Sequence, residues 1–214
     1  MTSSGDTRQH APATERNRQP ILEVLQRVLP PTGTILEVAS GTGQHAAYFA
    51  PRLTPRHWQP TDPNPQACDS IAAWQLHSPC DTLHPPLILD ATAIQWPVET
   101  SNDPLFKHHL ISAIVNINMI HISPWSACLG LMAGANRILP TNGVLYLYGP
   151  YKRAGQHTAS SNAAFDRSLQ MSNPQWGVRD LEAVITVAEA EGFQLKEVVQ
   201  MPANNLSVVF KRSL

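Results

Sequence analysis

Apolar residues along the chain alternate between two spacings, one typical of buried strands and the other typical of helices. The strand-like runs are short and rich in branched side chains, and they lie at 34–38, 57–61, 87–89, 112–118 and 144–148. Between them apolar residues recur at helical spacing, which predicts helices at 20–29, 44–53, 67–74, 123–139, 162–171 and 180–191. Strands that alternate with helices predict a mostly parallel sheet with helices on both faces.

The end of the chain departs from this alternation. Two strand-like runs, 195–201 and 206–211, are separated only by Pro202-Ala203-Asn204-Asn205. A connection this short joins antiparallel strands, because a parallel crossover needs a dozen or more residues. We therefore predict an α/β fold with a seven-stranded mostly parallel sheet, one antiparallel strand and helices on both faces. The length of 214 residues fits a single domain over 1–214.

Two segments lack the pattern of the rest. Residues 1–14 are polar, and we expect them to be mobile or to form a lid. They also lack the apolar core of a signal peptide. Residues 98–109 are polar and unpatterned, which predicts a surface insertion. The most apolar run, 110–122, is interrupted by two asparagines and a histidine, so no membrane span is expected.

The charge of the chain is low and balanced. Charged residues make up 14% and the formal net charge is −1, against about 25% charged residues in an average protein. The 15 Lys and Arg residues form no basic face, so a long nucleic acid is not an expected partner. Three cysteines without a CxxC pair indicate reduced thiols and a cytoplasmic protein. The nine histidines show no zinc-ligand spacing, so no metal is expected.

A buried strand, a glycine turn and a helix follow one another between Ile35 and Leu53. Gly41 and Gly43 allow the backbone to approach a ligand, and the free N–H groups of the new helix point toward it. The spacing Gly41-x-Gly43-x-x-Ala46 also satisfies the dinucleotide fingerprint, which leaves NAD as an alternative ligand. Glu37 inside the strand and the terminal hairpin both disfavour NAD.

An acid stands at the expected distance after the glycine turn. Asp62 lies 19 positions past Gly43, at the end of the strand 57–61, where it is placed to accept hydrogen bonds from ribose hydroxyls. Capping of the next helix is the alternative role for this carboxylate and for Asp90. The alternative for the two glycines is a tight turn, and the alternative for Glu37 is a buried structural acid.

Five separated motifs give a more specific indication. They are Pro12-Ala13-x-Glu15-Arg16-Asn17, Ala39-Ser40-Gly41-Thr42-Gly43-Gln44-His45, Asn118-Met119-Ile120-His121-Ile122-Ser123-Pro124-Trp125, Tyr148-Gly149-Pro150-Tyr151-Lys152 and Met201-Pro202-Ala203-Asn204-Asn205. Over about residues 9–212 the chain resembles a methyltransferase-like family of unknown function within the class I S-adenosylmethionine-dependent methyltransferases. It departs from motif I at Ala39, where the first glycine usually stands, and from the family at Ser112, where an acid is usual.

The resemblance implies a Rossmann-like class I methyltransferase fold and S-adenosyl-L-methionine as cofactor, but it names no substrate. The expected cofactor-binding residues are Arg16, Glu37, Ala39, Ser40, Gly41, Gly43, Asp62, Asp90, Ala91 and Asn116. The role of Asp90 and the Ala91 backbone, facing the adenine, is implied by the resemblance alone. Residues 10–18 are expected to fold over the cofactor, with Arg16 meeting a carboxylate of cofactor or substrate. A solvated basic helix start is the alternative for Arg16.

Candidates on the acceptor side come from the loops after the fourth and fifth strands. His121 is the candidate base because its ordinary pKa is near neutral, and a packed core histidine is the alternative. Asn118 and Tyr151 are the other expected catalytic residues. The predicted function is in-line methyl transfer from S-adenosylmethionine to a small polar acceptor. The alternative is a catalytically silent S-adenosylmethionine-binding module that regulates a partner protein, and a hydride-transferring NAD enzyme ranks third.

Overall fold

The computed structural model describes residues 6–213. Its helices are α1 (Pro12–Val28), α2 (Gln44–Phe49), α3 (Pro65–His77), α4 (Pro97–Thr100), α5 (Pro104–His108), α6 (Trp125–Ile138), α7 (Ser160–Ser172) and α8 (Leu181–Ala190), with the 3₁₀ turns η1 (Ala50–Arg52), η2 (Met119–His121) and η3 (Pro202–Asn204). Its strands are β1 (Thr34–Val38), β2 (His57–Asp62), β3 (Leu87–Ile88), β4 (Ile111–Ile117), β5 (Val144–Arg153), β6 (Gln156–His157), β7 (Arg179–Asp180), β8 (Phe193–Met201) and β9 (Asn205–Arg212).

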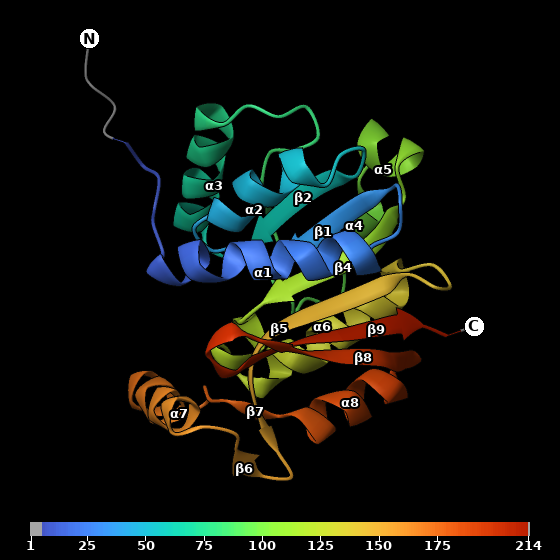
Figure 1. Ribbon diagram of the computed structural model, residues 1–214. Coiled ribbons are helices and arrows are strands. Elements are labelled where there is room, and N and C mark those ends of the chain that lie inside the picture. Colours follow the sequence, from blue (N-terminus) through green and yellow to red (C-terminus); the bar gives the residue numbers. More distant parts are fainter. Residues whose placement is uncertain (1–5, 214) are drawn as a thin grey trace.

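Seven strands form the main sheet in the order β3-β2-β1-β4-β5-β9-β8 (Figure 1). The first five are parallel, and β9 is antiparallel to both of its neighbours, β5 and β8. The short strands β6 and β7 pair with the far end of β5. The predicted α/β fold, with one antiparallel strand inserted into a parallel sheet, is confirmed.

The register of the central strands brings their carboxyl ends to one edge of the sheet. Val38 at the end of β1 pairs with Thr61 of β2 and with Asn116 of β4. The loops that follow these strands, at the left of Figure 1, therefore meet at one level. In open α/β sheets this edge is where ligands bind.

The core lies in two layers, one on each face of the sheet. Ile35 and the aromatic side chains of Phe49 and Trp58 are fully buried between the sheet and the helices α1 and α2. On the other face Leu36 packs with side chains of α6 and α8. Alternation along β1 explains this division, because successive side chains of a strand point to opposite faces.

The first helix begins earlier than the sequence predicts. The prediction placed its start at Pro20, but α1 begins at Pro12 and continues through Pro20. Pro12 occupies the start of the helix, where its fixed φ and missing N–H are tolerated. Thr14 is buried, so residues 12–14 of this segment belong to α1. The expectation that the segment is mobile or forms a lid stays a prediction. Residues 1–5 of the expected mobile segment lie outside the described residues.

Two further segments are more regular than predicted. The supposed insertion 98–109 contains most of α4 and all of α5, whose Val98 and Leu105 are buried against the core. These helices have only four and five residues, which is too short for a periodic signal. The expected loop after residue 148 is the continuation of β5 to Arg153, where β6 and β7 pair with it. Those partner strands have two residues each, which is too short for a pattern in the sequence to predict them.

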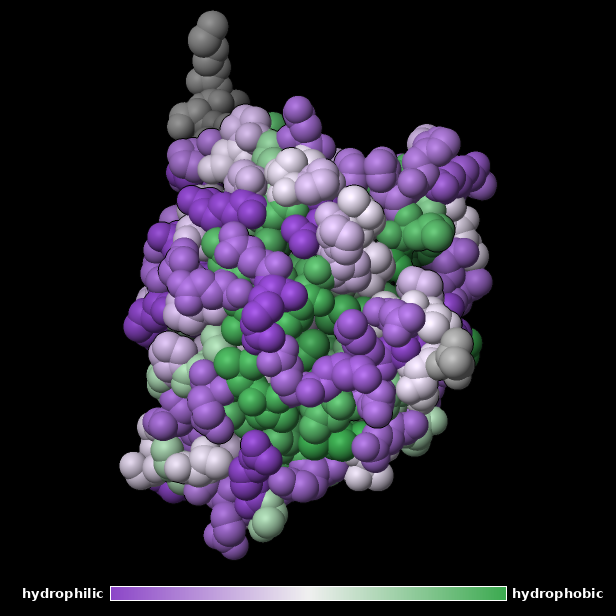
Figure 2. All heavy atoms as spheres, turned by 45° about the vertical axis from the view of Figure 1, so that its right-hand side comes forward, coloured by the Kyte–Doolittle hydropathy of each residue, from purple (hydrophilic) through white to green (hydrophobic). Residues whose placement is uncertain are grey.

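The front of the C-terminal hairpin is only partly covered by α1 (Figure 1). Figure 2 shows the consequence as apolar atoms exposed across the middle of this side of the molecule. A shallow groove of about 400 Å³ lies here between α1 and β8, lined in part by Val24 and Val199. The Arg27–Glu197 ion pair (2.7 Å) links the same two elements. None of the helices between residues 6 and 213 combines the length and apolar character that a membrane crossing requires.

Candidate functional site

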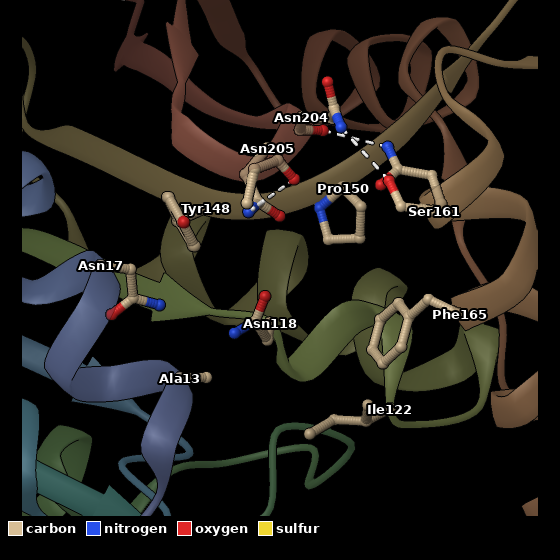
Figure 3. A pocket seen from close by; sticks show the side chains of 12 residues that line it. Ala13, Asn17, Asn118, Ile122, Tyr148, Pro150, Ser161, Phe165, Asn204 and Asn205 are labelled. Atoms are coloured by element: carbon tan, nitrogen blue, oxygen red, sulfur yellow. Dashed lines mark hydrogen bonds between the residues drawn. The ribbon is translucent and has the colours of Figure 1, made fainter.

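Two adjoining cavities open at the carboxyl edge of the sheet. The smaller, of about 360 Å³, lies over the ends of β1 to β4 and is lined by Val38, Ala39, Pro63, Leu89, Asp90, Ala91, Thr92, Met119, Ser123, Pro124, Ser126 and Ala127. The larger, of about 550 Å³, is lined by Ala13, Asn17, Asn118, Ile122, Tyr148, Pro150, Ser161, Asn162, Phe165, Ala203, Asn204 and Asn205 (Figure 3). The segment 118–123 lies between them, since Asn118 and Ile122 line the larger cavity and Met119 and Ser123 line the smaller one.

The glycine loop has the backbone conformation that its motif requires. Ala39, Gly41 and Gly43 all have a positive φ, of 60°, 56° and 82°. This left-handed region is one that glycine adopts without cost, which explains why glycine is usual where this chain has Ala39. A Cβ added to Gly41 would meet nothing within 4 Å, whereas one at Gly43 would lie 2.7 Å from Cα of Ile71. Gly41 therefore leaves the backbone open toward the site, and Gly43 lets α3 pack closely.

Asp62 holds the loop together from the end of β2. Its Oδ2 accepts a hydrogen bond from the Gly41 N–H (2.9 Å), and its Oδ1 accepts one from the Asn64 N–H (2.9 Å). Each carboxylate oxygen retains a second lone pair. Asn64, not Asp62, caps α3, since its side chain accepts from the Gln66 N–H. The capping alternative for Asp62 is therefore not what the structure shows.

Ser40 and Glu37 stiffen the strand end beneath the loop. The Ser40 hydroxyl accepts from the Thr61 N–H (3.1 Å), and the Glu37 carboxylate accepts from the Trp58 indole N–H (2.9 Å). Glu37 is 1% exposed, and burial raises its pKa to about 7 although the Trp58 and Ser40 hydrogen bonds oppose the shift. Neither residue lines a cavity. The contacts of Ser40 and Glu37 therefore support the glycine loop. A direct contact of Ser40 or Glu37 with the cofactor stays a prediction.

The raised pKa of Glu37 leads to a pH-dependent stability. The unfolded chain releases this proton near pH 4.5 and the folded chain near pH 7. The contribution of Glu37 to stability is therefore fully present below pH 4.5 and is lost as the pH rises through 7. The loss is about 3 kcal/mol. Glu37→Gln removes the titration while its amide oxygen can still accept from Trp58. Urea unfolding should show the variant more stable relative to wild type at pH 8 than at pH 4, by about that amount.

The exposed Glu23→Gln on α1 is the control for this change. Its unfolding free energy is expected to stay within about 0.5 kcal/mol of wild type at both pH values. The contrary result would be a difference in unfolding free energy between Glu37→Gln and wild type that is the same at pH 4 and at pH 8. It would show that the fold does not raise the pKa of the Glu37 carboxyl.

The turn after β3, with Asp90 and Ala91, forms one wall of the smaller cavity, and the expected contact of these residues with the adenine stays a prediction. Oδ1 of Asp90 accepts from the N–H and the hydroxyl of Thr92, both at 2.8 Å. The carboxylate of Asp90 is exposed, and Ala91 is 7% exposed. Helix α6 is held against this turn because Gly130 has no side chain, and a Cβ there would overlap the carbonyl oxygen of Ala91.

Gly130→Ala is expected to destabilise the fold by about 1–3 kcal/mol through this overlap. Helix propensity alone predicts the opposite sign, a gain of about 1 kcal/mol, so urea unfolding distinguishes the two effects clearly. Leu129→Ala, an exposed neighbour on the same helix, is the control and should change stability little. A stabilised Gly130→Ala protein would show that α6 does not rest on the Ala91 carbonyl.

The segment before α1 is attached to the glycine loop and to α3. The Gln9 N–H donates to the Ser70 hydroxyl (2.8 Å), which donates in turn to the Thr42 carbonyl (2.7 Å). The Ala11 N–H donates to the Gln44 side chain at 2.5 Å. One turn into α1, Asn17 Oδ1 accepts from the His45 ring N–H (2.8 Å).

Arg16 lies apart from both cavities. Its side chain is exposed, and no ion pair to it is found among residues 6–213. Its neighbours Ala13 and Asn17, one helical turn apart, line the larger cavity instead. The expected contact of Arg16 with a carboxylate stays a prediction. Its exposed side chain is consistent with the alternative, a solvated basic residue at the start of a helix.

The two strand-four asparagines have different surroundings. Asn116 is 1% exposed, and its Nδ2 donates to the Val38 carbonyl (2.9 Å), while its Oδ1 has no partner within the described chain. Asn118 has a φ of 65° and lines the larger cavity. Figure 3 shows its amide between Tyr148 and Ile122. Of the three expected catalytic residues, Asn118 alone lines this cavity.

His121 is packed in the core and is absent from the lining of both cavities. It is 0% exposed, and its Nδ1 accepts from the Arg179 N–H (3.3 Å). A Cβ at Gly149 would lie 2.5 Å from its Nε2, so β5 passes directly over the ring. Burial lowers the pKa of His121 to about 3. The geometry matches the packed-histidine alternative and gives the proposed base no route to an acceptor.

Tyr151 is also buried rather than facing the acceptor side. It is 0% exposed, its hydroxyl has no partner within the described chain, and its ring meets that of His121 edge-on with centroids 5.0 Å apart. Burial raises the pKa of Tyr151 well above its ordinary value. The expected catalytic role of Tyr151 therefore has no geometric support.

Several lining residues of the larger cavity were not among the predicted site residues. Asn17 and Asn205 stand in quoted motifs, so the motifs carried a signal for them. Ile122 also stands in one of these motifs. Phe165 stands in none of them, and an apolar residue on a helix gives no sign of a cavity wall. Within residues 6–213, no group of three His, Cys, Asp or Glu side chains is placed to hold a metal ion.

Solved structures share this fold at low sequence identity. An O-methyltransferase family protein from Burkholderia thailandensis superimposes with a TM-score of 0.75 and 14% identity, covering 94% of this chain and 57% of that chain. Human N-acetylserotonin methyltransferase in complex with S-adenosylmethionine gives 0.72 and 14%, covering 94% of this chain and 53% of that one. An O-methyltransferase family 2 protein from Planctomyces limnophilus in complex with apigenin gives 0.68 and 15%, covering 91% and 61%.

The chain thus spans little more than half the length of these structures. Their likeness establishes a fold of the S-adenosylmethionine-dependent methyltransferase type. At the level of sequence, a family described as a protein of unknown function (DUF938) matches residues 8–212, nearly the whole chain. The chain belongs to the DUF938 family.

Proposed function

We propose that the protein is an S-adenosylmethionine-dependent methyltransferase that acts on a small molecule. The observation that carries the proposal is the position of the smaller cavity. It is bounded by Ala39 of the glycine loop, by Pro63 directly after Asp62, and by the Asp90-Ala91 turn. The ends of β1, β2 and β3 thus border one cavity, and Asp62 directly precedes the lining residue Pro63. Loops after neighbouring parallel strands are where nucleoside ligands bind in this class of sheet.

The residues present fit this cofactor. The space beside Gly41 is open, so a ligand can approach the backbone there. Asp62 has lone pairs left for two ribose hydroxyls after it has accepted from Gly41 and Asn64. The apolar side chains of Leu89 and Met119 form walls suited to the flat face of adenine. The antiparallel strand β9 disfavours the NAD alternative.

When bound, S-adenosylmethionine supplies a sulfonium methyl group, and the electrons of the broken carbon–sulfur bond stay on sulfur. The task of the protein is then to align the acceptor and to exclude water. The turn 118–123 is suited to alignment because it forms the boundary between the cavities. Asn118, at its start, has a side-chain amide that can donate to or accept from an acceptor in the larger cavity.

We also propose that residues 10–18 act as a lid over the cofactor. The contacts of Ala11 with Gln44 and of Asn17 with His45 place this segment beside the glycine loop. Limited proteolysis tests the lid, since S-adenosylhomocysteine should slow cleavage in this segment. Cleavage at an unchanged rate in the presence of saturating S-adenosylhomocysteine would contradict it.

A small acceptor is supported by the size of the larger cavity, about 550 Å³. The human neighbour is named for N-acetylserotonin, and the Planctomyces neighbour is complexed with apigenin. Both names refer to small molecules, which supports the same kind of acceptor here.

The activity test uses S-adenosylmethionine with a ¹³C-labelled methyl group and the low-molecular-weight fraction of a cell extract. The expected result is S-adenosylhomocysteine formed only when protein and extract are both present, with the label recovered on an extract component. Binding of S-adenosylmethionine without any turnover would favour the alternative, a silent module that regulates a partner protein.

A further inference from the structure

We propose that the larger cavity selects an uncharged amphipathic molecule, held by apolar contact at one end and by side-chain amides at the other. The inference rests on the proposed function in calling this molecule the methyl acceptor. Three features carry it: two exposed apolar side chains that share one concavity, a set of asparagine amides facing them, and the lack of charged groups in the described lining.

The apolar end of the cavity is formed by Phe165 and Ile122. They come from different elements, α7 and the residue after η2, yet both line the same cavity. Their exposed fractions are 41% and 43%, which is high for large apolar side chains inside a concavity. Figure 3 shows both on one side of the cavity, with Pro150 nearby. An apolar ligand surface seated between them removes this area from water.

The polar end is formed by asparagine amides around the Tyr148 hydroxyl. Asn17, Tyr148 and Asn205 line this end of the cavity together. Burial raises the pKa of Tyr148, although Asn17 and Asn205 act in the opposite direction. Asn118 has no side-chain hydrogen bond to any partner between residues 6 and 213, so its amide is available to a ligand. Amides and a phenol both donate and accept, which suits an uncharged polar group.

The described lining contains no Asp, Glu, Lys, Arg or His among its twelve residues. The nearest charge on α7, Asp166, is 5% exposed and is paired with Lys152 (2.9 Å) and with His157 (3.2 Å). A charged ligand that left water here would find no counter-ion, and burial of an unpaired charge is unfavourable. An uncharged ligand pays no such cost.

The experiment compares three probes of one shape that differ in charge: 2-naphthamide, 2-naphthoate and 2-naphthamidine. Equilibrium dialysis against the full chain, with and without saturating S-adenosylhomocysteine, measures their affinities. The neutral amide is expected to bind at least about 10-fold more tightly than either ion. Equal binding by all three, or binding by none, would overturn the inference.

Variants locate the probe. Phe165→Ala and Asn118→Leu should each weaken 2-naphthamide binding at least about 5-fold, whereas Met171→Ala, an exposed apolar position on the same helix outside the cavity, should not. Ser161→Asp adds a counter-ion to the lining and should bring 2-naphthamidine above the amide. If Phe165→Ala and Met171→Ala behave alike, the probe does not occupy this cavity and the inference fails.

S-adenosylhomocysteine binding, measured separately by calorimetry, distinguishes the two proposals. If S-adenosylhomocysteine does not bind, the proposed function fails whatever the probes do. If it binds while the probes show no preference for the neutral amide, only the inference about the acceptor fails.

Discussion

Asp62→Ala is expected to weaken S-adenosylmethionine binding by about 2–4 kcal/mol, or roughly 30- to 1000-fold, because a buried carboxylate with two tasks is lost. The first task is to accept from the N–H groups of Gly41 and Asn64, both at 2.9 Å, which fixes the glycine loop. The second is the proposed acceptance from the ribose hydroxyls. Calorimetric titration of the variant measures the loss directly.

Two further variants separate these tasks. Asp62→Asn keeps one carbonyl oxygen and should give an intermediate affinity, since an amide can serve one acceptor role but not both. Asp69→Ala removes an exposed carboxylate from the adjacent helix α3 and should bind as wild type does. Wild-type affinity in Asp62→Ala would show that this acid does not contact the cofactor.

Acidification is expected to destabilise the fold by about 2–3 kcal/mol at pH 4.5 for each of His45 and His121. Burial lowers the pKa of both histidines to about 3, and Arg18 adds to the shift at His45 as Arg179 does at His121. Above pH 6.5 both rings are neutral in the folded and the unfolded chain, so the two histidines cause no loss of stability there. Between pH 6.5 and pH 3 only the unfolded chain takes up these protons, and stability falls with the pH.

Urea unfolding between pH 7.5 and pH 4.5 measures this effect. Replacement of either histidine by Gln should flatten the dependence, since Gln keeps a donor for Asn17 at position 45 and an acceptor for the Arg179 N–H at position 121. His108→Gln, on the exposed surface of α5, is the matched control and should leave the slope unchanged. Equal slopes in all four proteins would show that neither ring is held neutral by the fold.

The sequence contained enough to predict which strand ends meet at the proposed cofactor site. Residues that follow parallel strands meet at one edge, so the strand pattern alone brings Gly41, Asp62 and Asp90 together. The register of Val38 with Thr61 and Asn116 shows this geometry. At Ala39 the sequence departs from motif I, and the alanine has a φ of 60°, in the left-handed region that glycine adopts without cost.

The acceptor side was not predictable in the same way. His121 follows a strand and is titratable, which favoured a base, but Gly149 of the next strand passes over its ring and closes it off. The cavity wall made by Phe165 depends on the position of α7 across the cavity from Asn118 and Ile122, which no local pattern encodes. The surroundings of His121 and of Phe165 both depend on elements that are far apart in the chain.

The start of α1 was missed for a related reason. Pro20 is typical of a helix start, but the helix continues through it because residues on both sides are fixed by other elements. Ile21 and Leu25 are fully buried after it, and before it Asn17 bonds to His45. Tertiary contacts here outweigh the hydrogen bond that a proline inside a helix removes.

Calorimetric titration of the purified protein tests the proposal that the glycine loop and Asp62 form an S-adenosylmethionine site. S-adenosylmethionine, S-adenosylhomocysteine and NAD are titrated in parallel under one set of conditions. We expect saturable one-to-one binding of the first two and no heat of binding from NAD. Binding of NAD alone, or of none of the three, would contradict the proposal.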